Sequence, residues 1–326
     1  MVVVAQLSEV AVSVLPGITY FVYDNCLGAN TFLQSNSISA NMTHLEITIP
    51  LSDPSVIAHT SLVTLTMYTT TKQQQFVVGA FPSTLENLFD ESLDERGLIP
   101  PTITTIAFGS SYNLPLESLP PALKNLTFAN GSVFNHPILP GQLPATLESL
   151  SFESHYRHKL EESVLPTSLT KLTLPKPYNY AFEPNTLPHS LQNLQLSHDF
   201  NQPLNHLPPN LTRLTPGVKF NQPITIGQLP NTLEHLSLRD SSFFSHPIDV
   251  SVLPPNLKTY ALPPKYNYRI PKGGLPPTIE FLYLYTDQTF DSIGIPDDIP
   301  ALRTVFAPFL KSKHPLPPWM VFYKSK

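Results

Sequence analysis

The histidines are the first side chains in this sequence that could do chemistry, because imidazole binds metals and transfers protons near neutral pH. The chain has eleven of them. Several stand two residues after an aromatic residue, at a place where other copies of the same pattern have glutamine or tyrosine. The residues at this place are His136, His158, Tyr180, Gln202, Gln222, His246 and Tyr268. A place that accepts all three residue types favours a structural role over metal ligation.

Other catalytic patterns are weak. His155 and His158 flank Tyr156 and Arg157 without support from cysteine or carboxylate, so their spacing is not a zinc signature. Serines and carboxylates are too scattered to suggest a triad, and the sequence has no Gly-x-Ser-x-Gly, P-loop or Gly-x-Gly-x-x-Gly motif. We therefore expect a protein that is not an enzyme, with no catalytic residues, no metal site and no cofactor.

The composition of the chain limits which classes of partner are expected. Charged residues make up 13% of the chain and the net charge is -5, which gives no electrostatic reason to expect nucleic acid. No apolar stretch approaches the roughly 20 residues that a membrane helix needs, so no membrane span is expected. A single cysteine, Cys26, and an N-terminus without a basic signal region favour a reducing, cytoplasmic location.

The scattered polar residues are positioned by an internal repeat. The pattern Leu-Pro-x-x-Leu-x-x-Leu-x-(Leu/Phe) begins, with small departures in its first and last copies, at residues 81, 99, 119, 143, 165, 187, 207, 229, 253, 275 and 299. The steps between copies run from 18 to 24 residues. Weaker copies reach upstream to Leu15-Pro16-Gly17-Ile18, which makes about fourteen units.

The second half of most units is an aromatic residue followed by asparagine. The clearest copies are Phe134-Asn-His-Pro-Ile, Phe200-Asn-Gln-Pro-Leu and Phe220-Asn-Gln-Pro-Ile. With the leucine pattern that follows, these segments resemble FNIP repeats, a class similar to leucine-rich repeats. The resemblance implies a repeat fold and an interaction role. Many proteins with such repeats also carry an N-terminal F-box, but the repeats here start near residue 15, so we expect no such domain in this chain.

The spacing predicts one short parallel strand per unit, because the last two apolar positions alternate with outward residues. The prolines argue against helices in the returns, the segments that lead from one strand to the next. We expect extended or short 3₁₀ segments there. The aromatic residue should fill the space between coils, and its asparagine neighbour should bond backbone groups, in a ladder along the edge. The fold class is a leucine-rich-repeat-like solenoid over residues 1–310, with a C-terminal cap at 311–326.

Two places break the pattern. Pro216 replaces the last strand residue of its unit and should shorten that strand. Asp90 stands where an apolar residue is expected, and an acidic cluster follows it at Glu91, Asp94 and Glu95. We interpret the cluster as a solvated loop, with a docking patch for a basic partner as the alternative.

The outward strand positions form the candidate site. They are small and polar over most of the chain and become aromatic near its C-terminal end. A solvated surface is one interpretation, and a protein-binding face is the other. The residues predicted to contact a partner are Arg213, His235, Phe281, Tyr283 and Tyr285.

The sequence thus favours a non-enzymatic interaction or scaffold protein whose partner is another protein. One alternative is a structural protein that self-associates through the ends of the solenoid. The other is an extracellular ligand or carbohydrate binder, because Asn41, Asn125, Asn130 and Asn210 begin glycosylation sequons.

Overall fold

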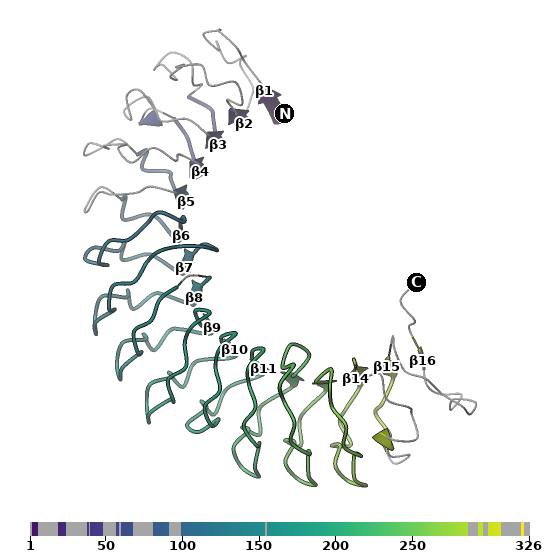
Figure 1. Ribbon diagram of the computed structural model, residues 1–326. Coiled ribbons are helices and arrows are strands. Elements are labelled where there is room, and N and C mark those ends of the chain that lie inside the picture. The colour runs from purple at the N-terminus through teal and green to yellow at the C-terminus, as the bar shows by residue number, and fades with distance from the viewer. Residues whose placement is uncertain are drawn as a thin grey trace. The chain divides into compact units, whose positions relative to one another are not determined.

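The computed structural model describes residues 2–5, 19–23, 38, 40–47, 57–58, 60–67, 81–90, 99–153, 155–285, 293–295, 299–307 and 321–322. The chain divides into two compact units, unit 1 over residues 1–158 and unit 2 over residues 159–326. Each unit is a stack of coils with one short strand per coil and, in the part described, almost no helix (Figure 1). The predicted leucine-rich-repeat-like solenoid class is confirmed.

Eight strands of four residues each lie in the part of unit 1 that the structure describes. They are β1 (Val2–Ala5), β2 (Tyr20–Tyr23), β3 (His44–Ile47), β4 (Thr64–Met67), β5 (Asn87–Asp90), β6 (Thr105–Phe108), β7 (Asn125–Phe128) and β8 (Ser149–Phe152). Each pairs in parallel with the next, and the pattern positions stay in phase, as in the pairs Ile106↔Leu126 and Leu126↔Leu150.

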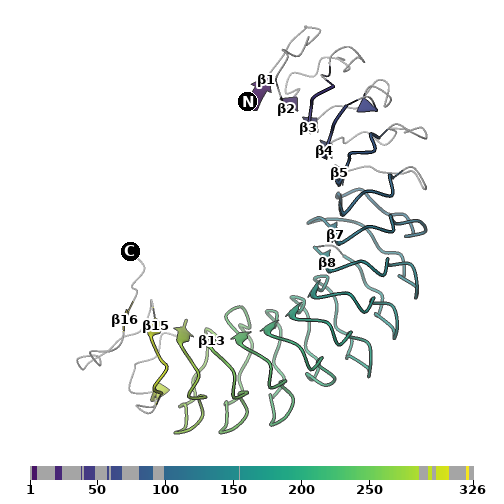
Figure 2. The same cartoon turned by 180° about the vertical axis from the view of Figure 1, so that it is seen from behind.

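The described residues of unit 2 form eight further strands, most of them shorter. They are β9 (Lys171–Thr173), β10 (Asn193–Gln195), β11 (Arg213–Thr215), β12 (His235–Ser237), β13 (Thr259–Leu262), β14 (Phe281–Leu284), β15 (Thr304–Phe306) and β16 (Val321–Phe322). All are parallel to their neighbours in the unit. Within this unit the strands lie on the inner side of the bend of the stack and the returns on the outer side (Figures 1 and 2).

The leucine motif folds as a turn followed by a strand. In Leu229-Pro230-Asn231-Thr232-Leu233, the amide of Leu233 donates to the Pro230 carbonyl at 3.0 Å, which closes a β-turn. Proline is tolerated at the first position of this turn because its missing N–H is not needed there. The same bond recurs in most units, for example between Leu123 and Pro120. Leu236 then points into the core and is fully buried, as period-two alternation requires.

The aromatic residues stack inside the coils, as predicted. Phe134, Phe200 and Phe220 are fully buried. The Phe128 and Phe134 ring centroids lie 4.2 Å apart, and the rings are nearly parallel, at 14°. One coil could not bury these rings alone, so neighbouring coils supply each other's core.

The asparagine ladder is also confirmed. In unit 2 the amide of Asn201 donates to the side-chain oxygen of Asn179 at 2.8 Å, and the amide of Asn221 donates to that of Asn201 at 2.8 Å. In unit 1 Asn113 accepts in the same way from Asn135, at 3.1 Å. Each asparagine thus satisfies a backbone donor of the next coil.

The returns contain a second column of turns that the sequence pattern does not predict. In Thr225-Ile226-Gly227-Gln228 the amide of Gln228 donates to the Thr225 carbonyl, and Gly227 has a φ of +85°. A positive φ at the third turn position alone defines a type II turn. Equivalent turns place Gly141, Ser163, Asn185, Ser251 and Gly273 at positive φ.

The register breaks have mixed outcomes. β11 ends at Thr215, as Pro216 predicts, but β10 and β12 are equally short without a proline, so the proline is not the cause of short strands in this unit. Asp90 ends β5, while the cluster at 91–95 lies outside the described residues. The cap at 311–326 is described only at β16, which pairs with β15, and the continuity of one solenoid over 1–310 stays a prediction.

Candidate functional site

All five predicted partner-binding residues lie on the outward side of the unit 2 sheet or at its margin. Arg213 and His235 are the first residues of β11 and β12 and face each other in the register. Phe281 and Tyr283 lie on β14, and Tyr285 follows it directly. We call this surface the unit 2 face. It comprises, for each of β9–β15, the residue before the strand and the first and third residues of the strand. The residue two places after the third strand residue is included where it is accessible.

Three of the predicted residues belong to one aromatic patch. Tyr283 stacks on Tyr285 with ring centroids 6.4 Å apart and an interplanar angle of 9°. Phe306 on β15 touches both, at centroid distances of 5.8 and 5.9 Å. Phe281 lies two residues before Tyr283 on β14, and the residue is 36% exposed. We call Phe281, Tyr283, Tyr285 and Phe306 the aromatic patch.

Arg239 borders the aromatic patch. Its guanidinium carbon lies 4.8 Å from the centroid of the Tyr285 ring, a cation–π contact. Burial raises the pKa of the Tyr285 phenol, while the Arg239 charge opposes that rise and Asp240 adds to it. The phenol therefore stays neutral, and Arg239 holds a positive charge at the rim of an apolar surface.

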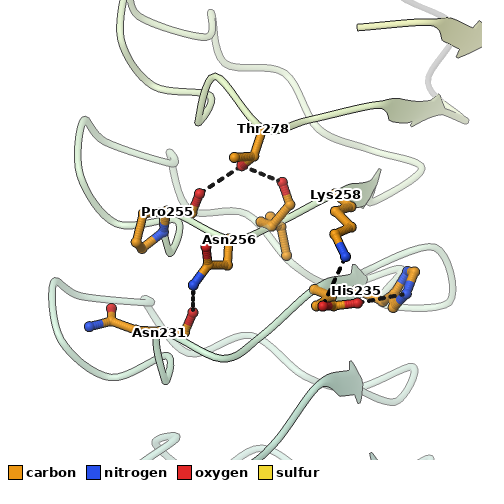
Figure 3. A network of polar contacts seen from close by, with 8 residues as sticks. Asn231, His235, Pro255, Asn256, Lys258 and Thr278 are labelled. Carbon is orange, nitrogen blue, oxygen red and sulfur yellow. Dashed lines mark hydrogen bonds and ion pairs between the residues drawn. The ribbon is translucent and has the colours of Figure 1, made fainter. Parts of the chain in front are cut away.

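The other two predicted residues lie in a polar cluster on β11–β13. The Lys258 amino group donates to a Glu234 carboxylate oxygen at 2.9 Å, and His235 Nε2 lies 3.9 Å from that carboxylate (Figure 3). These contacts, with Lys258 foremost, hold the pKa of Glu234 below its usual range. Burial lowers the pKa of His235, as does the charge of Arg213, so imidazole is neutral at pH 7.

Arg213 and His235 are therefore not part of the aromatic patch. Thr259 and Ala261 of β13 stand between the strand that carries His235 and the strand that carries the tyrosines. The site has two parts, a polar cluster on β11–β13 and an aromatic patch on β14 and β15.

Phe306 and Arg239 were not predicted from the sequence. Phe306 pairs with Tyr283 in the register, but the last unit lacks one residue of the pattern, which hid this column. Arg239 stands one residue past the last inward leucine of its unit, Leu238, and its contact with Tyr285 depends on the reach of a long side chain. The only sequence signal for Arg239 is that it takes the same place in its unit as Tyr285 takes in its own.

The histidine column is structural, as predicted. His136 Nε2 lies 2.9 Å from the Asn113 carbonyl oxygen, and His246 Nε2 lies 3.1 Å from that of Asn221. Gln222 donates to the Asn201 carbonyl in the same way. Each bond ties the side chain to the preceding coil, which explains why both histidine and glutamine are found there.

No other chemistry stands out in the part of the chain that the structure describes. Within those residues no three His, Cys, Asp or Glu side chains are grouped as metal ligands. No helix there has the length and apolarity to cross a bilayer. Two of the sequon asparagines are engaged: Asn125 Nδ2 donates to the Thr105 hydroxyl at 3.3 Å, and Asn210 Nδ2 donates to the His189 carbonyl at 3.0 Å.

The fold and this surface define a leucine-rich-repeat-like solenoid. Within it, residues 95–131, 134–177, 178–207 and 200–241 match the sequence profile of the FNIP repeat. This part of the chain is therefore built from FNIP repeats, and the resemblance seen in the motifs is confirmed.

One solved structure agrees on the fold. CroV588, described as a novel circular LRR protein, matches with a TM-score of 0.71 and 26% identity over 91% of this chain. This chain spans 43% of the CroV588 chain. YopM from Yersinia enterocolitica WA-314 matches with a TM-score of 0.46 and 17% identity, over 94% of this chain and 76% of YopM. No curated protein matches this chain in sequence.

Proposed function

We propose that this protein is a non-enzymatic interaction protein that binds another protein through the unit 2 face. The aromatic patch is the observation that carries the proposal. Its four rings come from β14, the residue that follows β14, and β15, on a face whose other outward residues are mostly small or polar. Tyrosine and phenylalanine are enriched in the cores of protein interfaces, where they bury large areas at low entropic cost.

The framework behind the patch supports the same proposal. Leu282 and Leu284 point inward from β14 and are fully buried, and β14 pairs with both β13 and β15. The outward rings therefore stand on a fixed backbone. Preordered side chains lose less entropy when a partner binds, which favours affinity. Repeat proteins of this architecture commonly use such sheet surfaces for protein contacts.

The test is a pull-down from extracts of the source cells with tagged wild type and a Phe281→Ala/Tyr283→Ala/Tyr285→Ala variant, followed by mass spectrometry. The matched control is Thr127→Ala/Ser151→Ala, which alters outward residues on β7 and β8 of unit 1. We expect the same protein to be recovered with wild type and control and lost with the aromatic variant. Circular dichroism and light scattering check that all three are folded and monomeric.

Two results contradict the proposal. If the aromatic variant recovers the same partner as wild type, the unit 2 face is not the interface. If only the protein itself is recovered and its mass grows with concentration, self-association is the better account.

A further inference from the structure

The accessible charges of the unit 2 face are mostly positive, although the whole chain is acidic. Five cationic side chains lie on it, against two carboxylates. The cations are Lys171, Arg213, Arg239, Lys258 and Arg303, and the carboxylates are Glu234 and Glu280. The chain as a whole carries a net charge of -5, so this positive surface is a local departure.

The equivalent positions of unit 1 have the opposite sign. On the described strands β3–β8, the same positions carry four carboxylates and one lysine. They are Glu46, Glu86, Glu148, Glu153 and Lys124. The repeat itself therefore does not impose positive charge at these positions, and the unit 2 face differs by its own sequence.

The two carboxylates of the unit 2 face are already paired. Glu234 accepts from Lys258 at 2.9 Å, and Glu280 lies 3.6 Å from Arg303. The positive charge in excess of these pairs is carried by Lys171, Arg213 and Arg239. Arg239 lies over the Tyr285 ring, so this charge borders the aromatic patch.

We infer that the unit 2 face selects an acidic polypeptide segment that carries an aromatic or large apolar side chain. This inference rests on the proposed function and adds the chemistry of the partner. The apolar side chain packs on Tyr283, Tyr285 and Phe306, while a carboxylate next to it pairs with Arg239. Further carboxylates along the segment meet Arg213 and Lys171. Opposite charges across an interface speed association and suppress wrong partners.

The charges within the face favour a polypeptide over a nucleic acid. Glu234, Glu280 and the neighbouring Asp240 would repel a continuous row of phosphates. An acidic segment of a protein carries its charges at intervals and can place neutral residues opposite these carboxylates. Phosphate binding normally relies on many cations with little intervening negative charge.

The test starts from a library of random twelve-residue peptides on phage, selected on the immobilised full-length protein. Enriched peptides are synthesised, and their affinities are measured by fluorescence anisotropy with four proteins. These are wild type, Arg213→Glu/Arg239→Glu, Tyr283→Ala and, as the matched charge control in unit 1, Lys124→Glu. We expect the enriched peptides to have more Asp and Glu than Lys and Arg, and to contain aromatic or leucine residues.

The proposal predicts how peptide affinity changes between the four proteins and with salt. The double arginine reversal should weaken binding at least about tenfold, because it turns attraction into repulsion. Raising the salt from about 50 to about 500 mM should weaken binding to wild type several-fold, since exposed charges are screened. Tyr283→Ala should weaken binding at both salt concentrations, and Lys124→Glu should leave it unchanged.

Other outcomes separate the two proposals. Neutral or basic peptides whose binding is lost in Tyr283→Ala would overturn the acidic partner and keep the proposed function. Failure to enrich any peptide, or peptides that bind all four proteins equally, would contradict both. A single-stranded DNA oligomer that binds wild type more tightly than any acidic peptide and loses that affinity in the arginine variant would replace the polypeptide by nucleic acid.

Discussion

Tyr260 is a buried tyrosine whose hydroxyl has no hydrogen-bond partner among the residues that the structure describes. It takes the inward place of β13 that Leu236 and Leu282 take on the adjacent strands, and burial raises the pKa of its phenol well above 10. Tyr260→Phe keeps the ring and removes a desolvated polar atom. We expect the free energy of unfolding to rise by about 1 kcal/mol. Urea unfolding followed by circular dichroism measures it.

Tyr266 supplies the matched control, because its hydroxyl is buried and used. It accepts a hydrogen bond from the Ile248 amide at 3.2 Å. Tyr266→Phe leaves that amide without its partner and should lower the free energy of unfolding by about 1–2 kcal/mol. If Tyr260→Phe destabilises the protein as much as Tyr266→Phe does, the Tyr260 hydroxyl is not an uncompensated group.

The pKa of His235 reports on the polar cluster. Burial lowers it, and the Arg213 charge lowers it further, while Glu234 raises it. Titration by NMR should therefore give a value below the ordinary 6.5 in wild type. Arg213→Gln should raise the pKa and Glu234→Gln should lower it. Shifts in the same direction in both variants would show that the cluster is not assembled as described.

The same depressed pKa gives a sign for the dependence of stability on pH. Between the folded pKa of His235 and 6.5, the unfolded chain binds more protons than the folded chain. The contribution of His235 to the free energy of unfolding is therefore fully present above pH 6.5, and it is lost as the pH falls through the folded pKa. Arg213→Gln should reduce this loss, which urea unfolding at pH 7 and pH 5 measures.

The type II turns of the returns are the elements most open to a simple test. Ser251 has a φ of +66°, where a side chain is strained. Gly227 takes the same place in the preceding coil, with a φ of +85°. A Cβ atom added at Gly227 would meet no other atom within contact distance. Gly227→Ala should lower the free energy of unfolding by about 1 kcal/mol, since alanine is strained in this conformation.

Ser251→Gly is the reverse change in the next coil. Relief of the strain exceeds the larger entropy loss of glycine, so we expect a gain of about 0.5 kcal/mol. Thermal and urea unfolding measure the change in the free energy of unfolding for both variants. Opposite signs support the turn geometry, whereas destabilisation by both substitutions would contradict it.

The strands, their phase and the asparagine ladder were predictable because each depends on a residue type repeated at a fixed spacing. Few folds other than a solenoid are compatible with leucine at alternate strand positions and proline ahead of each strand. The return turns were not predictable in this way, since their positive-φ place holds Gly141, Ser163 and Asn185 in turn, three residue types with no shared pattern. The contact of Arg239 with Tyr285 passes over the coil between them and depends on side-chain reach, which spacing does not encode.

At the scale of the whole molecule, the contacts between the described strands follow the order of the coils. Among the described strands, each contacts only the strands next to it in sequence. Stability in such an architecture is the sum of each coil's own stability and its contacts with its neighbours. A defect in one coil should therefore weaken the coils beside it and leave coils far along the chain unchanged.

Leu236→Ala tests this in unit 2. Leu236 is fully buried on β12, and removing its side chain should cost about 2–5 kcal/mol locally. We expect hydrogen exchange to accelerate for the amides of β11–β13 while β6–β8 keep their wild-type protection. Leu126→Ala on β7 is the reciprocal variant and should affect β6–β8 alone. Equal loss of protection in both units from either substitution would mean that the two units unfold together, so that a partner bound to the unit 2 face would stabilise unit 1 as well.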